Sequence, residues 1–189
     1  MDVFLLSLAT VAIAEMGDRT QLLSLVLAAQ YRKPWQIIAA ILLATIANHA
    51  LAGLVGIWFG RFLSPRILDG SVGATMLAMA LWTLVPDTPG EESARNGRSA
   101  FLTTLVAFFI AEIGDKTQIA TIALAAGTSN LVAVVAGTTS GMMLANVPVV
   151  FAGSAFARRL PMRLIHIAAS ILFAVLGVLF IGRAATGLR

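Results

Sequence analysis

Two short acidic motifs stand in the middle of apolar stretches of this 189-residue chain. The first, EMGDRTQ, contains Glu15 and Asp18, and the second, EIGDKTQ, contains Glu112 and Asp115. A carboxylate deep in an apolar segment is costly unless it is paired, hydrated or bound to a cation, so its presence there indicates function. Glu and Asp three residues apart lie on one face of a helix. Each motif can therefore present two carboxylates to a common site.

The charges of the motifs favour a divalent cation as the ligand. Four carboxylates against Arg19 and Lys116 leave two uncompensated negative charges, which one divalent cation neutralises. An all-oxygen ligand set suits Ca²⁺ or Mn²⁺, whereas Cu⁺ or Zn²⁺ sites use Cys, Met or several His, and this chain has no Cys and two His. The predicted metal ligands are Glu15, Asp18, Gln21, Glu112, Asp115 and Gln118.

Other polar residues near the motifs are expected to support the site. Thr20 and Thr117 follow each Asp and are expected to bond backbone or line the path. Asn48 and Asn146, on the following apolar segments, offer neutral oxygens. His49 could face the site, although a lone helical His more often makes a local hydrogen bond.

A purely structural interpretation of the motifs stays open. Glu15 with Arg19, and Glu112 with Lys116, have the i, i+4 spacing of helical ion pairs. The glycine inside each motif admits either a helix break, which frees backbone carbonyls for an ion, or close packing of the two motif helices. Both alternatives are compatible with the sequence.

The composition indicates that lipid surrounds most of the chain. Hydrophobic residues make up 59% of it and charged residues 12%, with a mean hydropathy of +0.91. A bilayer core about 30 Å thick needs about 20 apolar residues per helix. We predict an all-α integral membrane protein with six transmembrane helices, at about 3–29, 35–60, 66–86, 100–126, 131–157 and 162–182. Scattered basic residues argue against nucleic-acid binding despite a net charge of +4.

The two motifs mark two related halves. AEMGDRTQLLSLVLAA from Ala14 aligns without a gap to AEIGDKTQIATIALAA from Ala111, and Ala47-Asn48 has a weaker echo in Ala145-Asn146. We predict a first three-helix repeat at 1–86, a polar cytoplasmic linker at 87–99 and a second repeat at 100–189. Because each repeat has three helices, the second enters the membrane from the opposite side. Such three-plus-three inverted repeats are typical of secondary transporters.

Loop charges predict the orientation. One side of the predicted membrane domain holds Arg32, Lys33, Arg95, Arg98, Arg158, Arg159 and Arg163. The other holds Arg61, Arg66, Arg183 and Arg189. Seven against four favours the first side as cytoplasmic, so both termini are expected outside the cytoplasm. Close helix packing is expected at the small-xxx-small spacings Gly56 to Gly60 and Gly137 to Gly141.

The residues Glu15 to Thr20 and Glu112 to Thr117 resemble the duplicated E-x-G-D-(K/R)-T signature of the Golgi calcium/manganese transporter family and its MneA-like bacterial manganese exporters. The chain lacks the long leader and acidic central loop of eukaryotic members and is similar to the compact bacterial kind. The resemblance implies a cation/proton antiporter of the bacterial inner membrane that moves Mn²⁺ or Ca²⁺ out of the cytosol, with the motif carboxylates as the ion site.

The residues themselves are compatible with that activity. Protons and a metal ion compete for the same carboxylates, and such competition combined with alternating access is sufficient for antiport. The expected partners are the lipid bilayer and the cation, no cofactor is expected, and a homo-oligomer stays open. Alternatives are an exporter of amino acids or other small organic solutes, an intramembrane aspartyl protease using Asp18 and Asp115, and a scaffold that transports nothing. The sequence does not separate Mn²⁺ from Ca²⁺.

Overall fold

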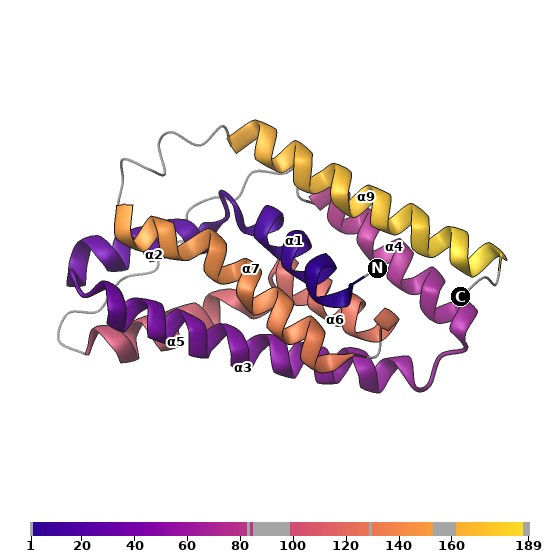
Figure 1. Cartoon of the computed structure of the whole chain (residues 1–189), viewed down its shortest axis with the longest axis horizontal. Coiled ribbons are helices and arrows are strands. Elements are labelled where there is room, and N and C mark those ends of the chain that lie inside the picture. The colour runs from indigo at the N-terminus through magenta and orange to yellow at the C-terminus, as the bar shows by residue number, and fades with distance from the viewer. Residues whose placement is uncertain (1, 83, 85–98, 129, 153–161, 187–189) are drawn as a thin grey trace.

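The computed structural model describes residues 2–82, 84, 99–128, 130–152 and 162–186, and every regular element in these ranges is a helix (Figure 1). The helices are α1 Val3–Glu15, α2 Arg19–Tyr31, α3 Pro34–Gly60, α4 Pro65–Trp82, α5 Ala100–Glu112, α6 Lys116–Thr128, α7 Leu131–Ala152 and α9 Met162–Thr186. The predicted all-α class is therefore confirmed for the described part of the chain.

The helices follow the predicted apolar segments, with one difference. The segments at 3–29 and 100–126 are each divided in two, as α1 with α2 and α5 with α6. Residues 87–98 of the predicted linker lie outside the described residues, as do 83, 85 and 86 of the predicted helix at 66–86 and the predicted helix end from 153 to 157. The same holds for several arginines of the orientation prediction: Arg95, Arg98, Arg158, Arg159 and Arg189.

Two described helices are long and apolar enough to cross a membrane by themselves. They are α3, with 27 residues, and the 21 residues Leu131–Phe151 of α7. The apolar helices α1 and α5 are shorter, at 13 residues each, because each ends at a motif glutamate. These features fit a membrane protein, while the six-span inverted repeat stays a prediction.

The two helix breaks lie inside the acidic motifs. Gly17 has a φ of 84° and Gly114 a φ of 76°, a left-handed conformation that glycine adopts without steric cost. Each glycine N–H donates a 2.7 Å hydrogen bond to the amide oxygen of a glutamine one turn into the next helix, Gln21 or Gln118. The sequence permitted either a break or uninterrupted close packing, and the structure shows the break.

The two halves of the chain are interleaved. Helices α1 and α2 of the first half pack on α7 of the second half. Helices α5 and α6 of the second half pack on α3 of the first half, so each motif packs against the long helix of the other half. The remaining helices α4 and α9 pair with each other along one side of the bundle (Figure 1). Separating the halves would therefore expose both motifs.

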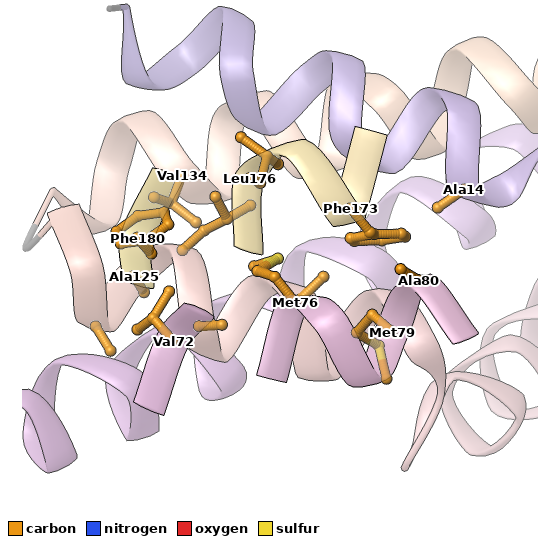
Figure 2. Packing of buried hydrophobic residues seen from close by; sticks show 14 residues of the cluster. Ala14, Val72, Met76, Met79, Ala80, Ala125, Val134, Phe173, Leu176 and Phe180 are labelled. Atoms are coloured by element: carbon orange, nitrogen blue, oxygen red, sulfur yellow. The ribbon is translucent and has the colours of Figure 1, made fainter. Parts of the chain in front are cut away.

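The α4 and α9 pair supplies much of a hydrophobic cluster. Figure 2 shows side chains of α9 in one cluster with side chains of α4, with Phe173 beside Met79 and Ala80. The cluster also includes Leu176 and Phe180 of α9 and Val72 and Met76 of α4. The two helices approach closely where α4 carries Gly73, since a Cβ atom there would lie 2.8 Å from the Gly177 carbonyl oxygen. Within the bundle, α9 also contacts α1, and α4 also contacts α6.

The expected close packing at small-xxx-small spacings is confirmed. A Cβ atom on Gly141 of α7 would lie 2.6 Å from the carbonyl oxygen of Leu8 and 2.8 Å from the amide nitrogen of Ala12, both in α1. A Cβ atom on Gly137, one turn earlier in α7, would likewise contact the backbone of α1. A Cβ atom on Gly56 of α3 would contact the carbonyl oxygen of Ile122 in α6. Glycine thus brings each long helix against the backbone of a motif helix.

Replacing Gly141 by Ala should push α1 away from α7, because the new methyl group meets backbone atoms that cannot rotate away. We expect the free energy of unfolding to fall by about 1–3 kcal/mol, the usual cost of overpacking. Thermal unfolding of the detergent-solubilised protein measures this. Gly182→Ala is the matched control, since its Cβ meets nothing within 4 Å. Equal midpoints for the two variants would contradict the close α1 and α7 contact.

Gln21→Leu tests the hydrogen bond across the first break. The variant removes the acceptor of the Gly17 N–H and the donor of a 2.8 Å bond to the Ala145 carbonyl. Unpaired polar groups in these surroundings should cost about 1–3 kcal/mol. Gln36→Leu, at an exposed position of α3, is the control and should leave the unfolding midpoint within a degree or so of wild type. A Gln21→Leu protein as stable as this control would show that the break holds without the glutamine.

Candidate cation site

Three of the four motif carboxylates gather between the two breaks. Glu15 is the last residue of α1, Asp18 occupies the N-cap position of α2 and Asp115 directly precedes α6. One carboxylate oxygen from each lies within 4.8 Å of the others, and the residues are 0%, 2% and 3% exposed. Carboxylates from both halves of the chain thus meet in one buried cluster.

Lys116 joins the two halves at this cluster. Its Nζ atom lies 2.9 Å from Oδ1 of Asp18, and both side chains are almost completely buried. The structural interpretation of the sequence paired Lys116 with Glu112 four residues earlier, but this ion pair reaches across to the other motif. The side chain of Arg19, the corresponding residue of the first motif, lies outside the described part of the structure.

The motif threonines contact the carboxylates. Thr20 donates a 2.7 Å hydrogen bond from its hydroxyl to Oε2 of Glu15. Thr117 places its hydroxyl and its backbone nitrogen 3.4 Å from Oδ2 of Asp115. The Oε1 atom of Glu15 is buried and makes no hydrogen bond within the described residues. A bound cation or a proton would satisfy this oxygen.

Glu112 lies beside the three-carboxylate cluster rather than in it. The turn that carries Glu112 also carries Asp115, whose N–H donates a 3.2 Å bond to the Glu112 carbonyl. The Glu112 side chain is fully buried, and its Oε2 atom lies 3.6 Å from Nε2 of His49 on α3. The fourth carboxylate therefore faces an imidazole.

The glutamines and asparagines connect the two halves around the cluster. Gln21 donates to the Ala145 carbonyl of α7, and Gln118 donates at 3.3 Å to the side-chain oxygen of Asn48 on α3. Asn48 donates in turn to the Phe109 carbonyl of α5. The amide oxygens of both glutamines accept the glycine N–H groups of the breaks, so each glutamine position is set by its own turn.

One polar residue of this network was missed in the sequence. Ser24 donates a 2.6 Å hydrogen bond to the side-chain oxygen of Asn146 on α7. Ser24 stands one helical turn after Thr20, and Thr121 stands one turn after Thr117. A polar residue repeated on the same helix face in both halves was the available signal.

The arrangement has the properties of a site for a small cation. It offers several buried carboxylate oxygens, with Lys116 as a compensating charge, and it joins elements from both halves of the chain. Hard divalent cations bind through oxygen ligands of this kind. Rearrangement of the halves would change the ligand set, because neither half supplies it alone.

Comparison with known proteins agrees with this chemistry. The family model of the divalent cation/proton antiporter GDT1 matches residues 3–91 and 100–187. A protein of Vibrio cholerae serotype O1, named as a candidate manganese exporter, is 52% identical over 167 residues, which cover 88% of this chain and 84% of that protein. A GDT1-like protein of Synechocystis is 26% identical over 200 residues, 93% of this chain and 94% of that protein. No solved structure matches the chain.

The two matched segments contain both acidic motifs and leave out only part of the central segment and a few terminal residues. The resemblance seen in the motifs is thereby confirmed. The family consists of transporters rather than enzymes, which sets aside the intramembrane protease alternative. Its described activity agrees with a buried cluster of carboxylates contributed by both halves, and the chain belongs to the divalent cation/proton antiporter GDT1 family.

Proposed function

We propose that this protein exports Mn²⁺ or Ca²⁺ from the cytosol in exchange for protons, with the cation bound between the two acidic motifs. The observation that carries the proposal is the convergence of Glu15, Asp18 and Asp115 at two helix breaks from opposite halves. Glu112 completes the proposed set of carboxylate ligands from its position one turn away. The amide oxygens of Gln21 and Gln118 remain proposed ligands for a state in which the breaks open.

The relative from Vibrio cholerae supports Mn²⁺ as the cargo. That protein is named as a candidate manganese exporter and shares 52% of aligned residues with this chain. Mn²⁺ and Ca²⁺ both accept carboxylate oxygens, so the three-carboxylate cluster alone does not separate them. We therefore propose Mn²⁺ rather than Ca²⁺ as the main transported cation, because the relative is named for manganese.

The geometry supports coupling of cation and proton movement. The carboxylate oxygens that would bind the cation are also the groups that would bind protons, so occupancy by one excludes the other. The carboxylates come from both halves, and Lys116 of one half pairs with Asp18 of the other, so movement of the halves relative to each other would change the ligands of the cation. Exchange then follows from one site that is loaded on alternate sides of the membrane.

We also propose the predicted inner-membrane location, with both termini outside the cytoplasm. In Figure 1, α1 begins toward one end of the bundle and α5 begins toward the other, which supports opposite entry of the two halves. In Figure 1, α2 ends at the end of the bundle where α5 begins, the end that we propose to be cytoplasmic. Arg32 and Lys33 are the next two residues of the sequence after α2.

Neutralising any motif carboxylate should abolish exchange, because each substitution removes charge and an oxygen ligand from a buried set. The variants are Glu15→Gln, Asp18→Asn, Glu112→Gln and Asp115→Asn. In proteoliposomes with an internal pH dye, added Mn²⁺ or Ca²⁺ should drive proton countermovement in wild type and about a hundredfold less in each variant. Asp69→Asn, on α4 and outside the cluster, is the control and should exchange like wild type.

Two results would count against the proposal. If wild type moves neither cation nor protons in either membrane orientation, cation antiport is wrong and export of a small organic solute becomes the leading function. If the four variants exchange as well as Asp69→Asn, the protein is an antiporter whose site lies elsewhere.

A further inference from the structure

His49 is a buried histidine that the motif does not include. It lies in the middle of α3, is 0% exposed, and neither ring nitrogen makes a hydrogen bond to any residue that the structure describes. A buried polar group without a partner costs free energy, so such groups in native proteins indicate a ligand, an ion or a water. The position of His49 therefore requires an explanation.

The imidazole is directed at the fourth carboxylate. Its Nε2 atom lies 3.6 Å from Oε2 of Glu112, which is too long for a hydrogen bond. A direct ion pair between imidazolium and carboxylate would close to about 2.7–2.9 Å. Two ligand atoms each about 2.1 Å from a shared cation lie about 3.0 to 3.5 Å apart. The observed separation is close to that of two ligands of one ion.

The neighbouring residue holds this part of α3 in place. Asn48 donates a 3.0 Å hydrogen bond to the Phe109 carbonyl of α5 and accepts one from Gln118 of α6. The helix that carries His49 is thus attached to both helices of the second motif. A rigid support of this kind is what a metal ligand needs.

The imidazole is present on one side of the pseudo-symmetric site only. Ala47-Asn48 corresponds to Ala145-Asn146, and the residue after Asn146 is Val147. The glutamate of the first motif, Glu15, accepts a hydrogen bond from Thr20, whereas Glu112 faces His49. The two acidic motifs are consequently unequal: one offers oxygen alone, and the other can offer oxygen and nitrogen.

We propose that His49 is a ligand of the transported cation, binding through an imidazole nitrogen beside Glu112, and that this nitrogen makes the protein select Mn²⁺ over Ca²⁺ and Mg²⁺. The inference rests on the proposed function, whose ion it specifies. Ca²⁺ and Mg²⁺ take oxygen ligands, whereas first-row transition ions accept imidazole. One nitrogen among several carboxylates favours Mn²⁺ without creating the multiple-His environment typical of Zn²⁺.

Transport selectivity is the first test. We expect His49→Gln to raise the KM for Mn²⁺ about tenfold or more, on the scale of losing a metal contact, with little change in the KM for Ca²⁺. The ratio of the two KM values distinguishes a ligand from a residue that only packs α3 on α5, since the latter shifts both values together. His166→Gln, at the other histidine of the chain, is the matched control and should keep the wild-type ratio.

A spectroscopic test first detects a histidine ligand in the wild-type protein, and the variants then assign it. Wild-type protein loaded with Mn²⁺ should show nitrogen modulation in pulsed electron paramagnetic resonance, and labelling with ¹⁵N-histidine should change its frequency. The His166→Gln protein should retain this signal, and His49→Gln should lose it. Mn²⁺ alone is the probe.

The outcomes separate the two proposals. Transport of Mn²⁺ without a ¹⁵N-sensitive signal, or a parallel rise of both KM values in His49→Gln, overturns His49 as a ligand and leaves the antiporter intact. Failure of wild type to transport any divalent cation overturns the proposed function and this inference with it. A ¹⁵N-sensitive signal together with a lowered preference for Mn²⁺ in His49→Gln establishes the ligand.

Discussion

The cost of burying carboxylates in an apolar bundle governs the rest of this structure. Glu15, Asp18, Glu112 and Asp115 are all at most 3% exposed. Such groups persist only where charge, hydrogen bonds or a cation compensate for lost water. Lys116 supplies the charge at Asp18, and Thr20 supplies a hydrogen bond at Glu15. Oε1 of Glu15 stays buried without a hydrogen bond to any described residue, so it is available to the cation of the proposed site.

The helix breaks follow from the same constraint. A continuous helix would direct Glu and Asp of one motif outward along a single face, whereas the breaks at Gly17 and Gly114 turn the two Asp residues to the start of a new helix. The glutamines that accept the glycine N–H groups also bond to the opposite half, at Ala145 and Asn48. The geometry of each break is therefore linked to the position of the other half, as alternating access requires.

Much of this arrangement could be predicted because it depends on local chemistry. Charged residues inside apolar runs predicted the carboxylates of the candidate site, and the glycine between Glu and Asp permitted either a break or close helix packing. The partner of Lys116 could not be predicted, because i, i+4 spacing favoured Glu112 while the interleaved packing brought Asp18 within 2.9 Å. For His49 the sequence left two possibilities open, because the direction of its side chain depends on how α3 packs against α5, and periodicity carries no information on that contact. In both cases the partner of the side chain is determined by tertiary contacts between the halves.

The differences between the halves are as informative as their similarity. Duplication explains two acidic motifs, two breaks and two glutamine contacts, and a strictly symmetric site would bind its ion identically from both sides. The chain departs from that symmetry where His49 corresponds to Val147 and where Glu112 lies outside the cluster that contains Glu15. An ion that moves from the three-carboxylate cluster toward Glu112 would exchange oxygen ligands for a mixed set. If the proposed ligands bind the ion, these unequal ligand sets would provide a physical basis for releasing it on the side opposite to its entry.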